Sequence, residues 1–135
     1  MTKKMVLIVI IIIAFFGGYN NNASYSRLNK YILIIYPSET DIGGFTCEVI
    51  ELTFKDGFVC YITSGLRRGV NINIRELGTI LNLINRKIPD IKIFIHNHFE
   101  MGEFSLDDWK FFSNLRQFGF RGEFLLYYKG DLYKR

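Results

Sequence analysis

The segment IKIFIHNHFEMGEFSLDD, from Ile91 to Asp108, decides how the rest of the chain is interpreted. Its first residues, Ile91 to Ile95, are mostly apolar and branched, which predicts a strand. Because side chains alternate between the two faces of a strand, we expect His96 and His98 to point the same way. They are the only two histidines in the sequence. Two neighbouring imidazoles at a strand end can supply two nitrogen ligands to one metal ion.

A second polar element follows the histidines. Ser105 and Asp108 open an amphipathic segment, and Asp108 can return a carboxylate to the same place. Two histidines, one carboxylate and an open position for water are the ligand set of a catalytic zinc site. Taken alone, Ser-x-x-Asp is also an ordinary helix capping box, and paired histidines on a strand can be surface residues. The order and spacing of the four residues together favour a metal site.

The same four residues resemble the signature of the JAMM (MPN-plus, or JAB-domain) metallopeptidases, in their bacterial JAB-like or RadC-like branch. That signature is His-x-His, a short loop and Ser-x-x-Asp. The resemblance implies that His96, His98 and Asp108 bind Zn²⁺ and that Ser105 helps to hold an oxyanion. The chain departs from the signature in two places, because its loop is one residue shorter than usual and Phe99 replaces the usual proline. The letters His-Asn-His do not indicate an HNH nuclease, whose third motif is not visible.

The resemblance covers roughly residues 46–135 and implies an α/β fold. The expected architecture is a sandwich of the JAMM type, which is cytidine-deaminase-like, with a mixed sheet, a leading hairpin and flanking helices. It also implies a glutamate as general base, at the start of the first strand of the hairpin. Glu48 fits that position and shares a face with apolar residues, where a carboxylate without a partner is costly to bury. The alternatives are that Glu48 is exposed and inert, or that Asp41 is the base, while Glu51 points to the other face.

The hairpin itself is predicted from residues 46–64, with the turn Lys55-Asp56-Gly57 between two apolar runs. If Phe54 lies opposite Phe58, Leu52 faces Cys60, and Cys47 lies several residue pairs away. A disulfide needs Cα atoms about 4.4–6.8 Å apart. We therefore expect Cys47 and Cys60 to be separate thiols.

Two helices are expected around the segment from Ile91 to Asp108. Asn73 and Glu76 form a capping box, which is followed by apolar residues at helical spacing up to Pro89. The second helix is expected from Leu106 to about Phe118, and a strand over Phe124–Tyr128 and a short terminal strand follow it. The residues expected to face inward from this helix are Leu106, Trp109, Phe112 and Leu115.

The first residues of the chain have the pattern of an export signal. Lys3 and Lys4 precede an unbroken apolar run from Met5 to Phe16, and small and polar residues follow. The run is shorter than the roughly twenty residues of a membrane span but typical of a signal-peptide core. We predict that residues 1–23 are a signal peptide or an uncleaved N-terminal anchor, and that residues 24–135 are the JAMM-like domain. The protein is then expected to be exported, whether periplasmic, secreted or anchored facing outward.

Residues 24–45 fit two interpretations. Tyr31 to Tyr36 can be a strand, or Tyr25, Leu28, Ile32 and Ile35 can line one face of a helix that ends before Pro37. The resemblance favours the helix, because the JAMM fold usually has a helix before its first strand.

Charge narrows the class of partner. The net charge of +4 falls to +2 when Lys3 and Lys4 are set aside, which is too little to predict nucleic-acid binding.

The expected function is an exported zinc metallopeptidase that hydrolyses a peptide or isopeptide bond in a peptide or protein substrate. Membrane contact is expected only through the N-terminal segment. The alternatives are a JAMM-like binding or structural module with weak or no activity, and a toxin-type effector domain.

Overall fold

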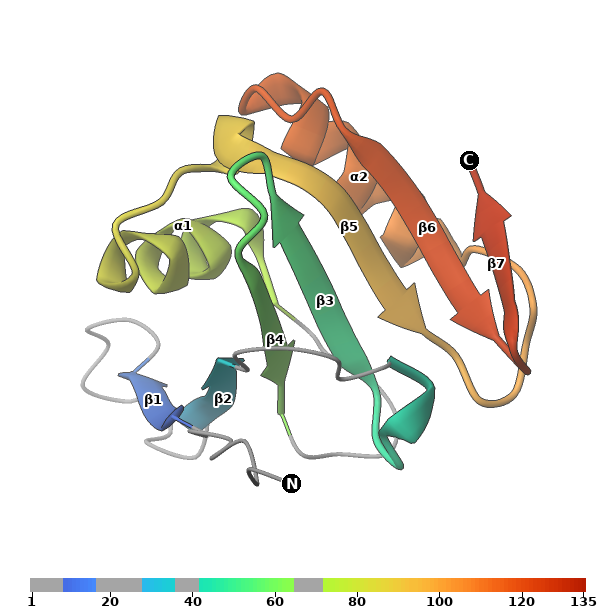
Figure 1. The fold of residues 1–135 in the computed structure, drawn as a ribbon, viewed down its shortest axis with the longest axis horizontal. Helices are drawn as coiled ribbons and strands as arrows, with labels where there is room; N and C mark the ends of the chain where they lie inside the picture. Colours follow the sequence, from blue (N-terminus) through green and yellow to red (C-terminus); the bar gives the residue numbers. More distant parts are fainter. Residues whose placement is uncertain (1–8, 17–27, 36–41, 65–71) are drawn as a thin grey trace, which may run out of the picture.

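The computed structural model describes residues 9–16, 28–35, 42–64 and 72–135. Over these residues the chain forms one mixed sheet of seven strands, in the order β1-β2-β4-β3-β5-β6-β7, and two α-helices (Figure 1). The expected α/β class with a mixed sheet is therefore confirmed. The strands are β1 Val9–Phe16, β2 Leu28–Ile35, β3 Val49–Phe54, β4 Val59–Thr63, β5 Ile91–Asn97, β6 Glu123–Tyr128 and β7 Asp131–Lys134. The helices are α1 Ile74–Leu83 and α2 Leu106–Gln117, with 3-10 turns η1 Ile42–Gly44 and η2 Ile88–Asp90.

Strands β3 and β4 form the predicted hairpin. Leu52 lies opposite Cys60, which confirms the register expected from the turn. The Gly57 N–H donates to the Phe54 carbonyl at 2.9 Å. Gly57 has a backbone φ of +90°, which residues with a Cβ atom rarely adopt. Cys47 and Cys60 are both free thiols, as this register predicts.

Strand β5 joins this hairpin to the C-terminal part of the sheet. It runs antiparallel to β3, with Ile50 opposite His96, and parallel to β6, with Phe94 opposite Phe124. Parallel neighbours need a crossover connection, which α2 provides between β5 and β6. The end of β5 is therefore held between β3 and β6; His96 lies within this end of the strand, and His98 is the first residue beyond it.

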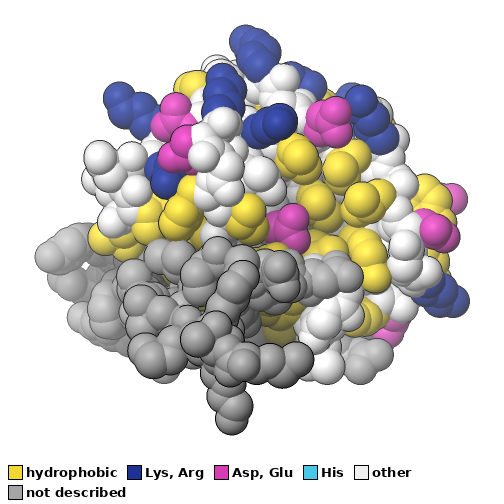
Figure 2. All heavy atoms as spheres, viewed as in Figure 1, with side chains coloured by type: hydrophobic (Ala, Val, Ile, Leu, Met, Phe, Trp, Pro, Cys, Tyr) yellow, Lys and Arg dark blue, Asp and Glu magenta, His cyan; other side chains and the backbone are white. Residues whose placement is uncertain are grey.

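Both helices cover the same face of the sheet. Side chains of α1 and α2 share one core with the strand residues that point to that side, and this core includes Leu52, Cys60, Ile62, Leu77, Ile80, Phe94, Phe112, Leu115 and Phe124. The expectation of helices flanking the sheet thus holds for one face of the described chain. The second face, seen in Figure 2, carries a smaller apolar cluster of Ile42, Val49, Tyr61, Ile95 and Leu125.

The inward face of α2 differs from the prediction. Phe112 and Leu115 are buried, but Leu106 is 69% exposed and Trp109 is 40% exposed, so these two assignments were wrong. Leu106 and Leu115 are nine residues apart, and at about 100° per residue they lie on opposite sides of a helix. Trp109 instead packs at the edge of the core beside Phe104.

The helix favoured within residues 24–36 is also wrong where the chain is described. Leu28–Ile35 is strand β2, which pairs antiparallel with β4 and places Leu33 opposite Ile62. Branched residues such as Ile32 and Ile34 favour a strand, and pairing with a buried neighbour outweighs the helical spacing. Tyr25 and Tyr36 lie outside the described residues.

The apolar run near the start of the chain contributes strand β1. Val9–Phe16 pairs antiparallel with β2 and has no other neighbour in the described sheet. Lys3, Lys4 and the expected cleavage position after Ala23 lie outside the described residues, so the signal or anchor stays a prediction. Within the described ranges, no helix has both the length and the apolar character needed to cross a bilayer.

Candidate metal centre

Strand β5 and its pairing with β6 position the two candidate histidine ligands. His96 is the sixth residue of β5 and is buried, with its side chain on the face that the helices cover. His98 follows the strand end, and its N–H donates to the Tyr127 carbonyl at 3.0 Å, so the chain continues along β6. This bond keeps the strand alternation, and His98 therefore points to the same side as His96.

Asp108 arrives from the start of α2. Ser105 is the N-cap residue, and its hydroxyl accepts a hydrogen bond from the Asp108 N–H at 3.1 Å. In return, the Ser105 N–H donates to Asp108 Oδ2 at 2.7 Å. The capping box is therefore present, and it fixes the carboxylate in the direction of the histidines. Ser105 and Asp108 therefore cap the helix and, at the same time, place a candidate metal ligand.

The three side chains converge on one point. His96 Nε2 lies 3.0 Å from His98 Nε2 and 3.2 Å from Asp108 Oδ1, while His98 Nε2 lies 3.3 Å from Asp108 Oδ2. The three residues form a group whose ligand atoms all lie within 4.8 Å of one another. Zinc–ligand distances of about 2.0–2.2 Å in a tetrahedron put two ligands about 3.3–3.6 Å apart. The observed separations lie at or just below this range, so small side-chain rotations would admit the ion.

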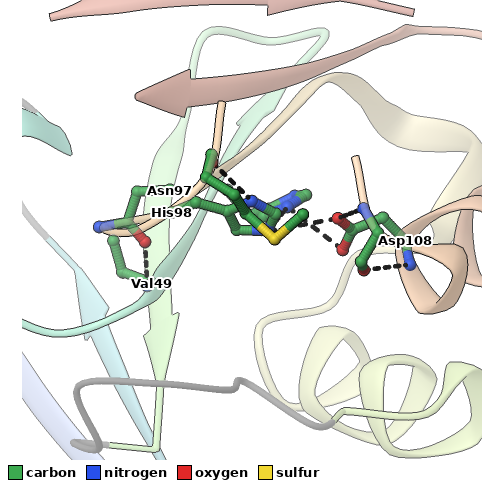
Figure 3. A network of polar contacts seen from close by, with 7 residues as sticks. Val49, Asn97, His98 and Asp108 are labelled. Atoms are coloured by element: carbon green, nitrogen blue, oxygen red, sulfur yellow. Dashed lines mark hydrogen bonds and ion pairs between the residues drawn. The ribbon is translucent and has the colours of Figure 1, made fainter. Parts of the chain in front are cut away.

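The loop after His98 orients its ring. His98 Nδ1 lies 3.2 Å from the Met101 carbonyl oxygen, which can only accept a hydrogen bond (Figure 3). In a neutral ring this assigns the proton to Nδ1 and leaves Nε2 as a lone pair that faces Asp108 and His96. Ring nitrogens that ligate a metal are commonly oriented in this way by their second nitrogen. The loop, although one residue shorter than in the JAMM signature, provides this contact.

The electrostatics of the site favour a bound cation. Burial by itself raises the pKa of Asp108, but hydrogen bonds to His96 and His98, with help from the Ser105 N–H, hold that pKa well below its usual range. Burial lowers the pKa of His98, but the hydrogen bond and charge of Asp108 outweigh it, so the pKa is raised. Asp108 is therefore an anion at neutral pH. In the absence of a metal, this anion favours the protonated form of His98.

The site opens into a cavity of about 350 Å³. Apolar and acidic side chains dominate its described wall, and the wall includes Glu48, Ile50, Ile72, Phe94, His96, His98, Phe99, Glu100, Met101, Ser105, Asp107, Asp108, Phe111 and Phe124. Such a concave, mostly apolar site with a few converging polar groups is typical of a ligand or substrate pocket.

The structure brings Glu48, the predicted base, to this cavity. Glu48 immediately precedes β3, is half-buried and lines the same wall as the histidines. Its charge is one of the causes of the raised pKa of His98, which places the carboxylate within electrostatic reach of the ring. Glu51 lies on the opposite face of β3, next to Tyr61 and Ile95 in the register. Asp41, the alternative base, lies outside the described residues.

Two buried polar residues near the site were not predicted from the sequence. Asn97, between the two histidines, is 2% exposed, and Thr63, at the end of β4, is 3% exposed. Both bond to the backbone on either side of Glu48 or to Glu48 itself. The available signal was weak, because Asn97 stands between two histidines and Thr63 precedes Ser64, so neither is an isolated polar residue in an apolar run.

Comparison with known proteins gives no relative. No protein-family model matches the chain, and neither the curated proteins nor the solved structures provide a significant match.

Proposed function

We propose that this chain is a zinc-dependent metallopeptidase of the JAMM type that hydrolyses a peptide or isopeptide bond. The observation that carries the proposal is the convergence of His96, His98 and Asp108 on one point in a cavity that Glu48 also lines. The order of elements is consistent with the JAMM resemblance, because a hairpin, a helix, the histidine strand, a loop, a capped helix and a further strand follow one another.

The three candidate ligands suit zinc by their chemistry. Two neutral imidazoles and one carboxylate leave at least one coordination position open, as in catalytic rather than structural zinc sites. A zinc ion held there would act as a Lewis acid and lower the pKa of a water from 15.7 to about 7. Asp108 is already the anion that such binding needs, and the Met101 carbonyl would keep the His98 proton on Nδ1 when the metal displaces a proton from Nε2.

The remaining residues of the wall would perform the proton transfers and hold the substrate. Glu48 would accept the proton of the attacking water and deliver it to the leaving amine, as a general base and then a general acid. The Ser105 hydroxyl would stabilise the negative charge that develops on the carbonyl oxygen. The apolar side chains Phe99 and Phe111 would exclude bulk water from the cavity.

We also propose that the protein is exported, since Lys3, Lys4 and the apolar run form the signal pattern. The residues of that run that the structure describes form β1, which is an edge strand. Removal by a signal peptidase would leave a six-stranded sheet whose central strands and metal centre are unchanged. A retained segment would instead anchor the domain, and the N-terminal sequence of the exported protein distinguishes these two outcomes.

The proposal is tested with the full chain, by measuring its zinc content together with hydrolysis of a fluorogenic peptide library and of lysine isopeptide substrates. We expect Glu48→Gln to retain zinc and lose hydrolysis, because an amide cannot accept the proton. Glu51→Gln is the matched control, since Glu51 lies on the other face of the same strand, and it should remain active. Activity that survives Glu48→Gln but not Asp41→Asn would move the base to Asp41. Zinc binding without any hydrolysis would make the chain a binding module.

A further inference from the structure

We propose that Asn97 is a positioning residue that, together with Thr63, fixes the backbone around Glu48 and so holds its carboxylate at the wall of the cavity. The catalytic consequence of this inference rests on the function proposed above. The arrangement of the backbone does not depend on it.

The Asn97 side chain bonds to the residues immediately before and after Glu48. Its Oδ1 accepts a hydrogen bond from the Val49 N–H at 2.7 Å (Figure 3). Its Nδ2 donates to the Cys47 carbonyl at 3.1 Å. Both polar ends of the carboxamide are therefore used. One buried side chain thus ties down the two peptide groups that bracket Glu48.

Thr63 holds the second of these peptide groups, the one between Glu48 and Val49, from its other side. Its hydroxyl donates to the Glu48 carbonyl at 2.7 Å and lies 3.4 Å from Cys47 Sγ. Thr63 lies opposite Val49 at the end of β4, and Asn97 is the last residue of β5. Side chains from the strands on both sides of β3 therefore reach the same three-residue segment, Cys47 to Val49.

These bonds replace a missing part of the sheet. The β3–β5 pairing begins at Ile50, opposite His96, so Cys47 and Glu48 lie beyond the regular ladder. A segment just outside a strand is normally free to fray. Here the Asn97 and Thr63 side chains provide the backbone hydrogen bonds that further strand pairing would have given, and Glu48 itself lines the cavity.

The position of Asn97 in the sequence gives this contact its functional meaning. Asn97 stands between His96 and His98 and is one of the residues that line the same cavity. The three residues therefore link Glu48 to two candidate metal ligands through a single short stretch of backbone. Residues that orient catalytic groups in this way usually affect activity by about 10–100-fold when they are removed.

The test compares Asn97→Ala, Asn97→Asp and Thr63→Val in the full chain, with Asn73→Ala as the matched control. Asn97→Asp keeps an acceptor for the Val49 N–H but loses the donor to Cys47, and Thr63→Val keeps the shape of the side chain but loses its hydroxyl. Asn73 caps α1 and does not itself line the cavity, although the preceding residue, Ile72, does. The backbone order parameter of Glu48 and the amide exchange rate of Val49 are measured by NMR on the metal-free protein. Zinc affinity, kcat and KM are measured on the same samples.

We expect the order parameter of Glu48 to fall from about 0.85 to below about 0.6 in Asn97→Ala, with faster exchange of the Val49 amide. Asn97→Asp and Thr63→Val should show smaller losses, and the control none. Zinc affinity should stay within a few-fold of wild type, while kcat falls by about 10–100-fold with little change in KM.

Two results would overturn the inference. One is an unchanged order parameter at Glu48 in both Asn97→Asp and Thr63→Val, which are the variants least expected to disturb folding. The other is a kcat that does not depend on how Glu48 is held, seen either as a mobile Glu48 with unchanged kcat or as a kcat loss that only follows a loss of zinc. Failure of the proposed function would look different, since the wild type would then bind no zinc and hydrolyse nothing while the order parameters still decide whether Glu48 is held.

Discussion

The two helices begin with the same motif but use it differently. At the start of α1, the Glu76 N–H donates to Asn73 Oδ1 at 2.8 Å and the Asn73 N–H donates to Glu76 Oε1 at 3.3 Å. At the start of α2, Ser105 and Asp108 make the equivalent pair of bonds at 3.1 and 2.7 Å. The carboxylate of Glu76 lies against the buried Tyr31, whose pKa is raised by burial and then by this neighbour. The carboxylate of Asp108 faces two imidazoles in a cavity.

The difference shows how a structural motif can preorganise a site. A capping box fixes the side chain of its third residue by a bond to the backbone, so that carboxylate loses little further freedom when it binds something else. The two capping boxes differ in the residues that their carboxylates face. The α1 box faces the core, and the α2 box faces His96 and His98 at the end of β5.

The largest expected difference between the boxes is in zinc affinity. Asp108→Asn should weaken zinc binding by more than about 100-fold, because even residues outside the ligand set cost 10–100-fold when changed. Glu76→Gln, the equivalent change in the other box, should leave affinity unchanged. Titration with a competing chelator measures both. Equal affinities for the two variants would mean that Asp108 only caps the helix.

The next difference is in hydrolysis. Ser105→Ala and Asn73→Ala each remove an N-cap, but only Ser105 lies in the cavity wall. We expect Ser105→Ala to retain zinc and to lower kcat by about 10²–10³-fold, as for loss of an oxyanion donor. Asn73→Ala should stay close to wild type in steady-state kinetics. A similar rate loss in both variants would attribute the effect of Ser105 to helix capping.

A smaller effect is expected in the pH dependence of stability of the metal-free protein. The lowered pKa of Asp108 gives stability that is present above about pH 4 and is lost as the pH falls below it. The raised pKa of His98 gives stability that is complete below about pH 6.5 and is lost as the pH rises through the folded value. The pair therefore contributes most between about pH 4 and 6.5. Thermal unfolding across this range should show a maximum that Asp108→Asn flattens and Glu76→Gln keeps.

The smallest expected effect is on the free energy of unfolding, and it should be similar for the two capping boxes. Without metal, Asn73→Ala and Ser105→Ala should each lower the free energy of unfolding by about 1 kcal/mol, and the glycine variants by only a few tenths. Chemical denaturation measures this. A much larger loss for Ser105→Ala would show that Ser105 holds more than the start of α2.

Features coded by neighbouring residues were predictable from the sequence. The hairpin turn at Gly57, both capping boxes and the histidine pair depend on residues a few positions apart, and each is present in the structure. Strand β2 was not predicted correctly, because its identity depends on pairing with β4, some thirty residues further along the chain. Leu106 is exposed because inward positions assigned at every third residue drift around the helix, by about 60° at each step, so that Leu106 and Leu115 end on opposite sides of α2. The bonds of Asn97 depend on the pairing of β5 with β3, because their partners lie 48 and 50 residues away in the sequence.

The most direct measurement is the zinc content of the purified full chain and of its ligand variants, by elemental analysis after dialysis. We expect about one zinc per chain in the wild type, and little in His96→Ala, His98→Ala and Asp108→Ala, because a three-ligand site has no ligand to spare. Glu76→Ala should retain the full amount. No zinc in the wild type, or full zinc in all three ligand variants, would contradict the proposed metal centre and leave two capped helices with a pair of histidines between them.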